Sequence, residues 1–385
     1  MLRDLYVSRG PAAGFAAVGA FWGSFAALVP VLKPQVGLSD GAFGLALLIT
    51  SVGAVMAMWL APLAERALGA RALGVLTALV ALATLLPGHT MTGVTFTLAM
   101  LGVTMTSGTL DVAMNARVSA LEARVKRSLM NLNHAVFSVS YAACALCTGL
   151  AREAGIGPAT ILTVAGLFIA LLALQAFAAP VPDADHEAEG VEGAPLAWSL
   201  LLPGGAIILI AFMSEQATEG WSALHLERNL GAGAAQGSLG PALLGITMAV
   251  GRLAGQVVAN RVSERRVIRW AAITAGIGAC IAALAPTLAV AYAGFSILGL
   301  GVSVVAPMAY AWIGRMVPNR YRSHAISRIS VVGYAGFFIG PPLMGFLSEG
   351  FGLWASFVMI GGILFIVPLV LVPMLSRRSA LGITG

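Results

Sequence analysis

Apolar blocks of about 20 residues recur along the chain, and they constrain its fold more than any other feature. A block of that length matches a hydrocarbon core ~30 Å thick, because a helix rises about 1.5 Å per residue. Backbone groups in such a core must bond within their own segment, which favours helices. Hydrophobic residues make up 59% of the chain and charged residues 10%, and the mean hydropathy is +0.91. The sequence therefore predicts an all-α integral membrane protein.

Pro, Gly or charged residues separate the blocks, and their positions predict about twelve transmembrane helices. The predicted spans are 9–32, 40–63, 70–90, 92–116, 129–151, 157–179, 199–224, 236–259, 267–287, 289–313, 325–348 and 352–375.

Basic residues are distributed unevenly between the two sides that this alternation defines. With the N-terminus in the cytoplasm, only Lys33, Arg152 and Arg228 of the 22 Lys and Arg residues fall on the opposite side, and Arg252 falls inside a span. The positive-inside rule predicts this asymmetry for an even number of helices with both ends cytoplasmic. The net charge of +6 therefore reflects topology rather than nucleic-acid binding. We expect a multi-pass protein of the bacterial inner membrane with cytoplasmic N- and C-termini.

The longest polar stretch, 180–197, lies near the middle of the chain and is rich in Pro, Ala, Gly and acid. This composition is typical of a flexible linker. We therefore divide the chain into an N-terminal bundle at 1–179, a cytoplasmic acidic linker at 180–198 and a C-terminal bundle at 199–385.

The two halves contain matching segments. Leu101–Thr104 reads Leu-Gly-Val-Thr and Leu300–Ser303 reads Leu-Gly-Val-Ser, while Arg127-Ser128 is matched by Arg322-Ser323. Secondary transporters are commonly built from such repeats. The matches predict two pseudo-symmetric six-helix bundles.

At this level the layout resembles the major facilitator superfamily, which has a conserved basic loop after its second helix. The pattern is G-x3-D-R/K-x-G-x-R/K-R/K, and the segment at 62–71 matches it with Pro62 in place of Gly and Glu65 in place of Asp. A second copy follows the eighth helix. In that superfamily the motif acts as a gate latch. The resemblance thus implies gate roles for Glu65, Arg66, Arg71, Arg252 and Arg261.

A narrower resemblance is carried by two short motifs. Gly108–Asn115 places an acid four residues before an Asn, and Glu219 lies shortly before Trp221-Ser. These motifs are similar to those of the fucose-permease-like sugar:proton symporters, and in particular the YbjJ-type bacterial subgroup. Fucose permeases also use an acid in the first helix, and 15–31 contains none, so sugar specificity and proton coupling do not follow from the resemblance alone.

Ionisable groups at bilayer depth cost ~2.5–3.5 kcal/mol on insertion scales, so each one is a functional candidate. Asp111 and Asn115 share a helix face, as do Asn131 and His134, and the two helices are antiparallel neighbours. One interpretation is a proton acceptor surrounded by hydrogen-bonding groups that respond to the conformational state. The other is a structural cluster that braces the cytoplasmic gate.

The seventh predicted helix contains Glu215 and Glu219 one turn apart. They could couple transport to protons or bind a solute that is cationic or rich in hydroxyls, and Trp221 could stack on a sugar. The alternatives are a rim exposed to periplasmic water and, for Trp221, an interfacial aromatic belt.

Proton-coupling candidates are Asp111, Glu219, Glu215 and His134. Substrate-binding candidates are Asn115, Asn131, Asn133, Trp221, Phe21, Trp22 and Tyr310. For the aromatic candidates, lipid contact or helix packing is the alternative.

The sequence contains no GxxxxGK[ST] or HExxH stretch and no Cys/His cluster, so we expect no enzyme, cofactor or metal. The function hypothesis is a secondary active transporter that moves a small polar, sugar-like solute by proton-coupled symport. The alternatives are an efflux carrier for amphipathic compounds and a non-transporting receptor. The expected partners are a small-molecule substrate, protons and the lipid bilayer, without nucleic acid, and we expect a monomer.

Overall fold

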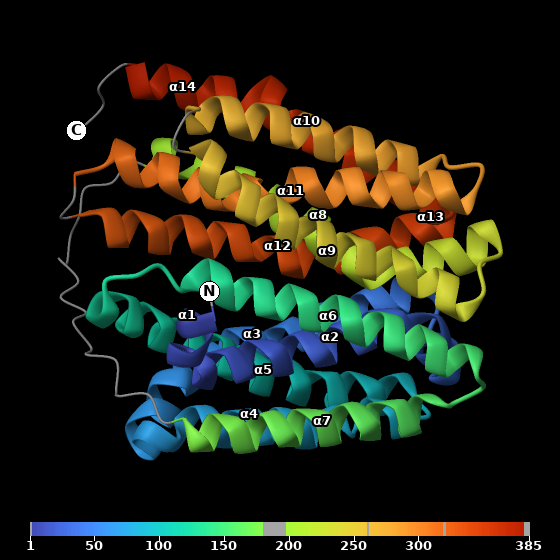
Figure 1. Ribbon diagram of the computed structural model, residues 1–385. Coiled ribbons are helices and arrows are strands. Elements are labelled where there is room, and N and C mark those ends of the chain that lie inside the picture. The colour runs from blue at the N-terminus through green and yellow to red at the C-terminus, as the bar shows by residue number, and fades with distance from the viewer. Residues whose placement is uncertain (1, 180–197, 260–261, 319–320, 381–385) are drawn as a thin grey trace. The chain divides into compact units, whose positions relative to one another are not determined.

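The computed structural model describes residues 2–179, 198–259, 262–318 and 321–380, and its secondary structure there is helical throughout (Figure 1). The first elements are α1 Leu2–Val7, α2 Arg9–Gln35, α3 Asp40–Leu68, η1 Gly69–Arg71, α4 Ala72–Thr84, η2 Pro87–His89, α5 Gly93–Val125, α6 Met130–Glu153 and α7 Pro158–Ala178. They are followed by α8 Trp198–Leu230, α9 Ala234–Ala259, α10 Glu264–Ala283, α11 Leu288–Met316, α12 Arg322–Phe351, α13 Leu353–Ile366, η4 Val367–Leu371 and α14 Val372–Ala380.

Within the described residues, 11 stretches are long and apolar enough to cross a membrane. One of them, Asp40–His89, contains both α3 and α4. The prediction of an all-α membrane protein with about twelve spans is confirmed.

Contacts between Cα atoms divide the chain into two compact units. Unit 1 comprises Met1–His186 with Ala223–Ile246, and unit 2 comprises Glu187–Ser222 with Thr247–Gly385. Helices α8 and α9 each run from one unit into the other. The linker predicted at 180–198 lies almost wholly outside the described residues, and the bundle limits derived from it stay predictions.

Unit 1 is organised around α2, which packs on α5, α6 and α7, while α3 packs on α5 and α4 on α7 (Figure 1). Glycines allow the close approach of α2 to α6. A Cβ atom added at Gly19 would lie 3.1 Å from the backbone nitrogen of Tyr141. Small residues of this kind commonly mediate helix packing in membranes.

In unit 2, α10 packs on α11 and α13, and α12 approaches α8 through a row of glycines. A Cβ atom added at Gly336 would lie 3.0 Å from the Met213 nitrogen, and one at Gly340 would lie 3.1 Å from Met213 Cγ. Glycines at this spacing allow the backbones of α8 and α12 to approach closely.

The matching segments of the two halves make the same contact in each unit. The Thr104 hydroxyl of α5 donates to the Leu101 carbonyl and fills the space beside Gly53 of α3. The Ser303 hydroxyl of α11 donates to the Leu300 carbonyl and fills the space beside Gly251 of α9. The repetition supports an internal duplication.

One predicted boundary is wrong. The fourth predicted span ends at 116, but α5 continues to Val125, and its C-cap Lys126 adopts a left-handed conformation (φ 54°). The segment 117–125 contains neither Gly nor Pro, so nothing in it stops the helix.

Candidate functional site

Two carboxylates and one guanidinium meet in unit 2, and we call Glu215, Glu219 and Arg252 the two-acid group. Glu215 and Glu219 lie one turn apart on α8, and Arg252 lies on α9. Arg252 Nη2 donates to Glu215 Oε1 at 3.2 Å, and the two side chains are 24% and 19% exposed. In the part of the chain that the structure describes, we find no hydrogen bond to the half-buried Glu219 carboxylate.

The two-acid group has one more acid than base. A guanidinium beside a carboxylate favours its charged form, so Glu215 has a dedicated counterion that Glu219 lacks. Glu219 is therefore the member of the group best able to take up a proton or to accept a hydrogen bond from a solute.

Aromatic side chains pack on α8 one turn before the two-acid group. The ring centroids of Phe212 and Phe337 lie 4.9 Å apart, and Tyr334 stacks against both rings. The predicted site residue Tyr310 is half-buried, and its hydroxyl accepts a hydrogen bond from Ser330 at 3.0 Å. Trp221 is only 1% exposed, so it belongs to the packed interior in this structure.

In unit 1 the predicted polar residues lie on α5 and α6, which contact each other. Asn115 Nδ2 donates to Asp111 Oδ1 at 3.2 Å and to the Asp111 carbonyl at 2.8 Å, and the Asp111 side chain is exposed. The half-buried His134 ring makes an edge contact with Phe15 of α2, with centroids 4.9 Å apart. Asn131 is half-buried on the same helix as His134.

Other predicted substrate-binding residues of unit 1 take part in packing. Asn133 is fully buried and donates to Ser8 Oγ at 3.1 Å and to the Leu129 carbonyl. Phe21 is fully buried, with Trp22 at its edge. Trp22 is half-buried. Their roles in binding stay predictions.

The predicted gate residues are distributed among three surroundings. Glu65 is buried and pairs with Arg117, with Nη2 to Oε2 at 3.0 Å. Arg66 and Arg71 are exposed. Arg252 belongs to the two-acid group, and Arg261 lies outside the described residues.

Arg117 is a structural residue that sequence reasoning missed. It is 1% exposed and also donates to the Gly69 carbonyl at 3.0 Å, which ties α5 to the end of α3. Unit 2 repeats this pair between Glu264 of α10 and Arg315 of α11. An alignment of the two halves could have revealed this pair. In each half the acid precedes the matching segment, at 101–104 or 300–303, and the arginine follows it.

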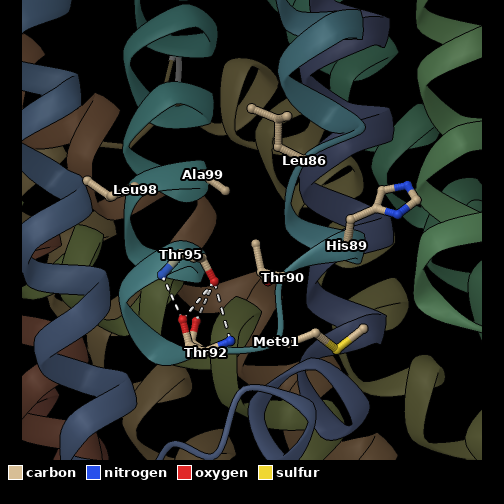
Figure 2. A pocket seen from close by; sticks show the side chains of 8 residues that line it. All are labelled: Leu86, His89, Thr90, Met91, Thr92, Thr95, Leu98 and Ala99. Carbon is tan, nitrogen blue, oxygen red and sulfur yellow. Dashed lines mark hydrogen bonds between the residues drawn. The ribbon is translucent and has the colours of Figure 1, made fainter.

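A pocket of about 570 Å³ lies between η2 and the first turns of α5 (Figure 2). Apolar side chains such as Leu86, Met91 and Leu98 form much of its wall, and the hydroxyls of Thr92 and Thr95 bond each other at the start of α5. No carboxylate lines it, so it differs in chemistry from the two-acid group. Among the described residues, no three His, Cys, Asp or Glu side chains gather as a metal site requires.

Comparison with known proteins gives consistent results. Residues 204–381 match the family model of the Major Facilitator Superfamily. An uncharacterized MFS-type transporter of Yersinia pestis is 28% identical over 348 residues, which cover 89% of this chain and 89% of that protein. The membrane protein MosC of Rhizobium meliloti is 26% identical over 343 residues, covering 89% of this chain and 84% of MosC.

Solved structures share the fold over nearly the whole chain. A bacterial homologue of the human lysosomal transporter Spinster has a TM-score of 0.77 at 16% identity and covers 98% of both chains. The nucleoside transporter NupG has a TM-score of 0.76 at 13% identity, covering 96% of this chain and 98% of NupG. A D-xylose-proton symporter has a TM-score of 0.69 at 14% identity, covering 96% of both chains.

Proposed function

Because this chain belongs to the major facilitator superfamily, we propose that it is a secondary active transporter that carries a small polar solute together with protons. The carrier works by alternating access, so that its solute site opens to each side of the membrane in turn. Its location is the bacterial inner membrane, with both termini cytoplasmic, as the distribution of basic residues indicates.

The observation that carries this proposal is the two-acid group. A carboxylate at membrane depth is costly, and a structural role would give it a counterion, as Arg252 does for Glu215 at 3.2 Å. Glu219 has no basic side chain of its own in the described part of the chain. A carboxyl group that takes up and releases a proton during transport explains why an acid is kept there.

Proton coupling follows if Glu219 binds a proton in one conformation and releases it in the other. The proton comes from the side where the proton concentration is high and is delivered with the solute to the opposite side. Protonation must change the relative stability of the two conformations, because a ligand that binds both equally shifts nothing. Asp111 is the second candidate carrier, since it is exposed and bonded only to Asn115 in the described residues.

A solute rich in hydroxyls matches the chemistry of the carboxylates, amides and aromatic rings described above. Carboxylates and amides accept hydrogen bonds from hydroxyls, and aromatic side chains such as Phe212 and Tyr334 offer flat apolar surface. The names of two proteins with the same fold, a nucleoside transporter and a D-xylose-proton symporter, point to the same class. We therefore place sugars and nucleosides first among the solutes to test.

Counterflow in proteoliposomes tests the proposal. Purified protein is reconstituted, loaded in turn with pentoses, hexoses, nucleosides and amphipathic cations, and assayed for exchange of the labelled solute. We expect exchange of a sugar or nucleoside. Exchange of amphipathic cations alone would favour an efflux carrier, and binding without any exchange would favour a receptor.

Site variants then test the coupling residues. Glu219→Gln and Asp111→Asn are compared for accumulation driven by an inward proton gradient, with Glu349→Gln, at an exposed position near the end of α12, as the matched control. We expect Glu219→Gln to abolish accumulation while keeping exchange, because exchange needs no net proton movement. If both site variants accumulate solute as the control does, the coupling assignment is wrong.

A further inference from the structure

The pocket of about 570 Å³ shown in Figure 2, which we call the η2 pocket, is lined by side chains between 86 and 99. Contacts from outside the pocket fix the turn that forms one of its walls. Gln35 Nε2, at the end of α2, donates to the Gly88 carbonyl at 3.2 Å and to the Thr90 carbonyl at 2.8 Å. Gly88 is buried against α7, where an added Cβ atom would lie 2.8 Å from the Ala159 Cα atom. The fold itself therefore sets the shape of the η2 pocket.

The walls of the η2 pocket are apolar and unusually exposed. Leu86, just after α4, is 52% exposed, and Met91 and Leu98 are 68% and 62% exposed. Ala99 of α5 is 7% exposed and points toward Leu86 across the pocket (Figure 2). Apolar side chains in such positions must be covered by something other than water.

The η2 pocket opens toward lipid rather than toward the solute passage. The stretches Asp40–His89 and Gly93–Val125, which form it, are both long and apolar enough to cross a membrane. Leu98 and Asp111 are 13 residues apart on α5, which places them on roughly opposite sides of the helix. Asp111 marks the polar side of α5, so Leu98 and the pocket beside it belong to the side that faces the bilayer.

The polar groups of the η2 pocket suit an anion. Among the lining residues, all of which the structure describes, none is acidic, and the exposed His89 is the one titratable side chain. An imidazole donates a hydrogen bond in its neutral and in its charged form. The hydroxyls of Thr92 and Thr95 bond each other at 2.9 Å at the start of α5, which is the positive end of the helix dipole. An apolar pocket with a basic group at the end of a membrane span matches a lipid that has an acyl chain and a phosphate.

We propose that the η2 pocket binds one phospholipid molecule, with an acyl chain between Leu86 and Ala99 and the headgroup phosphate beside His89. Lipid tails are as apolar as the pocket wall, so the hydrophobic effect does not favour the pocket over the bilayer. Packing around the chain and the contact with the phosphate provide the preference, because a chain in a preformed pocket touches more protein atoms than one on a flat helix face. The proposal requires only a membrane protein and is independent of the transported solute.

Binding of the first lipid to purified protein tests this site. The protein is extracted into a mild detergent, washed free of native lipid and titrated with dioleoylphosphatidylglycerol, and the one-lipid complex is counted by native mass spectrometry. We expect the first lipid to bind more tightly than the lipids that follow. A parent protein that binds its first and later lipids equally would overturn the proposal.

Filling the η2 pocket should weaken this first binding step. Leu86→Trp places a larger side chain between the walls, and we expect the apparent Kd of the first lipid to rise about tenfold. Leu202→Trp is the matched control, since Leu202 on α8 is 50% exposed and lies in the other unit. Equal affinities in these two variants would contradict a site at the pocket. Ala99→Phe fills the pocket from α5 and replaces Leu86→Trp if the latter lowers the thermal unfolding midpoint.

The position of the phosphate is tested separately. His89→Ala removes an exposed side chain and should raise the apparent Kd for dioleoylphosphatidylglycerol about threefold, the effect of one modest hydrogen bond. Dioleoylglycerol has the same chains without the phosphate, and its binding should not change in His89→Ala. An equal change for both lipids, or no change for either, would overturn the placement of the phosphate beside His89. None of these measurements depends on transport, so they stand or fall apart from the proposed function.

Discussion

Helix α8 contributes to two groups of charged side chains that differ in balance. The two-acid group has two carboxylates for one guanidinium. Its Glu215–Arg252 contact is one hydrogen bond of 3.2 Å. The second group, the six-charge cluster of unit 1, has three acids and three bases: Lys33, Asp40, Arg152, Glu153, Glu227 and Arg228. Its Arg152–Glu227 contact consists of two hydrogen bonds of 2.8 Å each. A matched group is suited to hold helices together, whereas an excess acid is suited to exchange a proton. The comparison separates carboxylates whose charge is matched by a base from Glu219, which we propose takes up and releases a proton during transport.

Changing the balance of the two-acid group should have the largest effect. Arg252→Gln leaves two carboxylates without a base, and we expect uptake to fall about tenfold or more because an uncompensated buried charge is strongly unfavourable. The double variant Arg252→Gln with Glu215→Gln returns the group to one excess acid and should recover much of the uptake. Initial rates of solute uptake into proteoliposomes measure the activity of both variants. A double variant as inactive as Arg252→Gln would show that charge balance is not what matters here.

The paired acids of the two units should differ from each other in stability. Glu65→Gln removes the partner of Arg117, which is 1% exposed, and should cost about 3–5 kcal/mol. Glu264→Gln removes the partner of Arg315, which is 61% exposed, and should cost about 0–1 kcal/mol. Apparent thermal unfolding midpoints in one detergent measure the difference. Equal shifts of the unfolding midpoint would contradict the conclusion that one pair is buried and the other exposed.

An effect smaller than that of Glu65→Gln is expected at Asn133, where sequence and structure suggest different roles. Asn133→Ala removes the bond to Ser8 and should cost about 0.5–1.5 kcal/mol of stability, with KM for the solute unchanged. Ser8→Ala is the matched control, since it removes the same bond from the other side. A rise in KM for Asn133→Ala alone would instead support the binding role that the sequence predicts.

Much of the fold could be predicted because bilayer thickness fixes the length of each apolar block. The spans and the matching segments at 101–104 and 300–303 follow from local patterns. The end of α5 could not be predicted in this way. The charge of Arg117 predicts an end at 116, whereas Arg117 is buried by its pair with Glu65, which is 52 residues away in sequence.

The candidate site was only partly predictable for the same reason. The spacing of Glu215 and Glu219 places them on one helix face, which a sequence shows directly. The pairing of Arg252 with Glu215 depends on how α8 and α9 bring the two side chains together, and the gate role predicted for Arg252 stays a prediction. The six-charge cluster depends on partners 75 and 188 residues apart, and no local pattern records such distances.

The most direct test of the central claim is proton movement driven by the solute itself. Proteoliposomes containing the protein and a trapped pH-sensitive dye are given an inward gradient of the sugar or nucleoside found by counterflow, with no imposed pH gradient. We predict acidification of the interior with the parent chain and none with Glu219→Gln. Solute entry without any change of internal pH in the parent protein would contradict the proposal that this carrier couples its solute to protons.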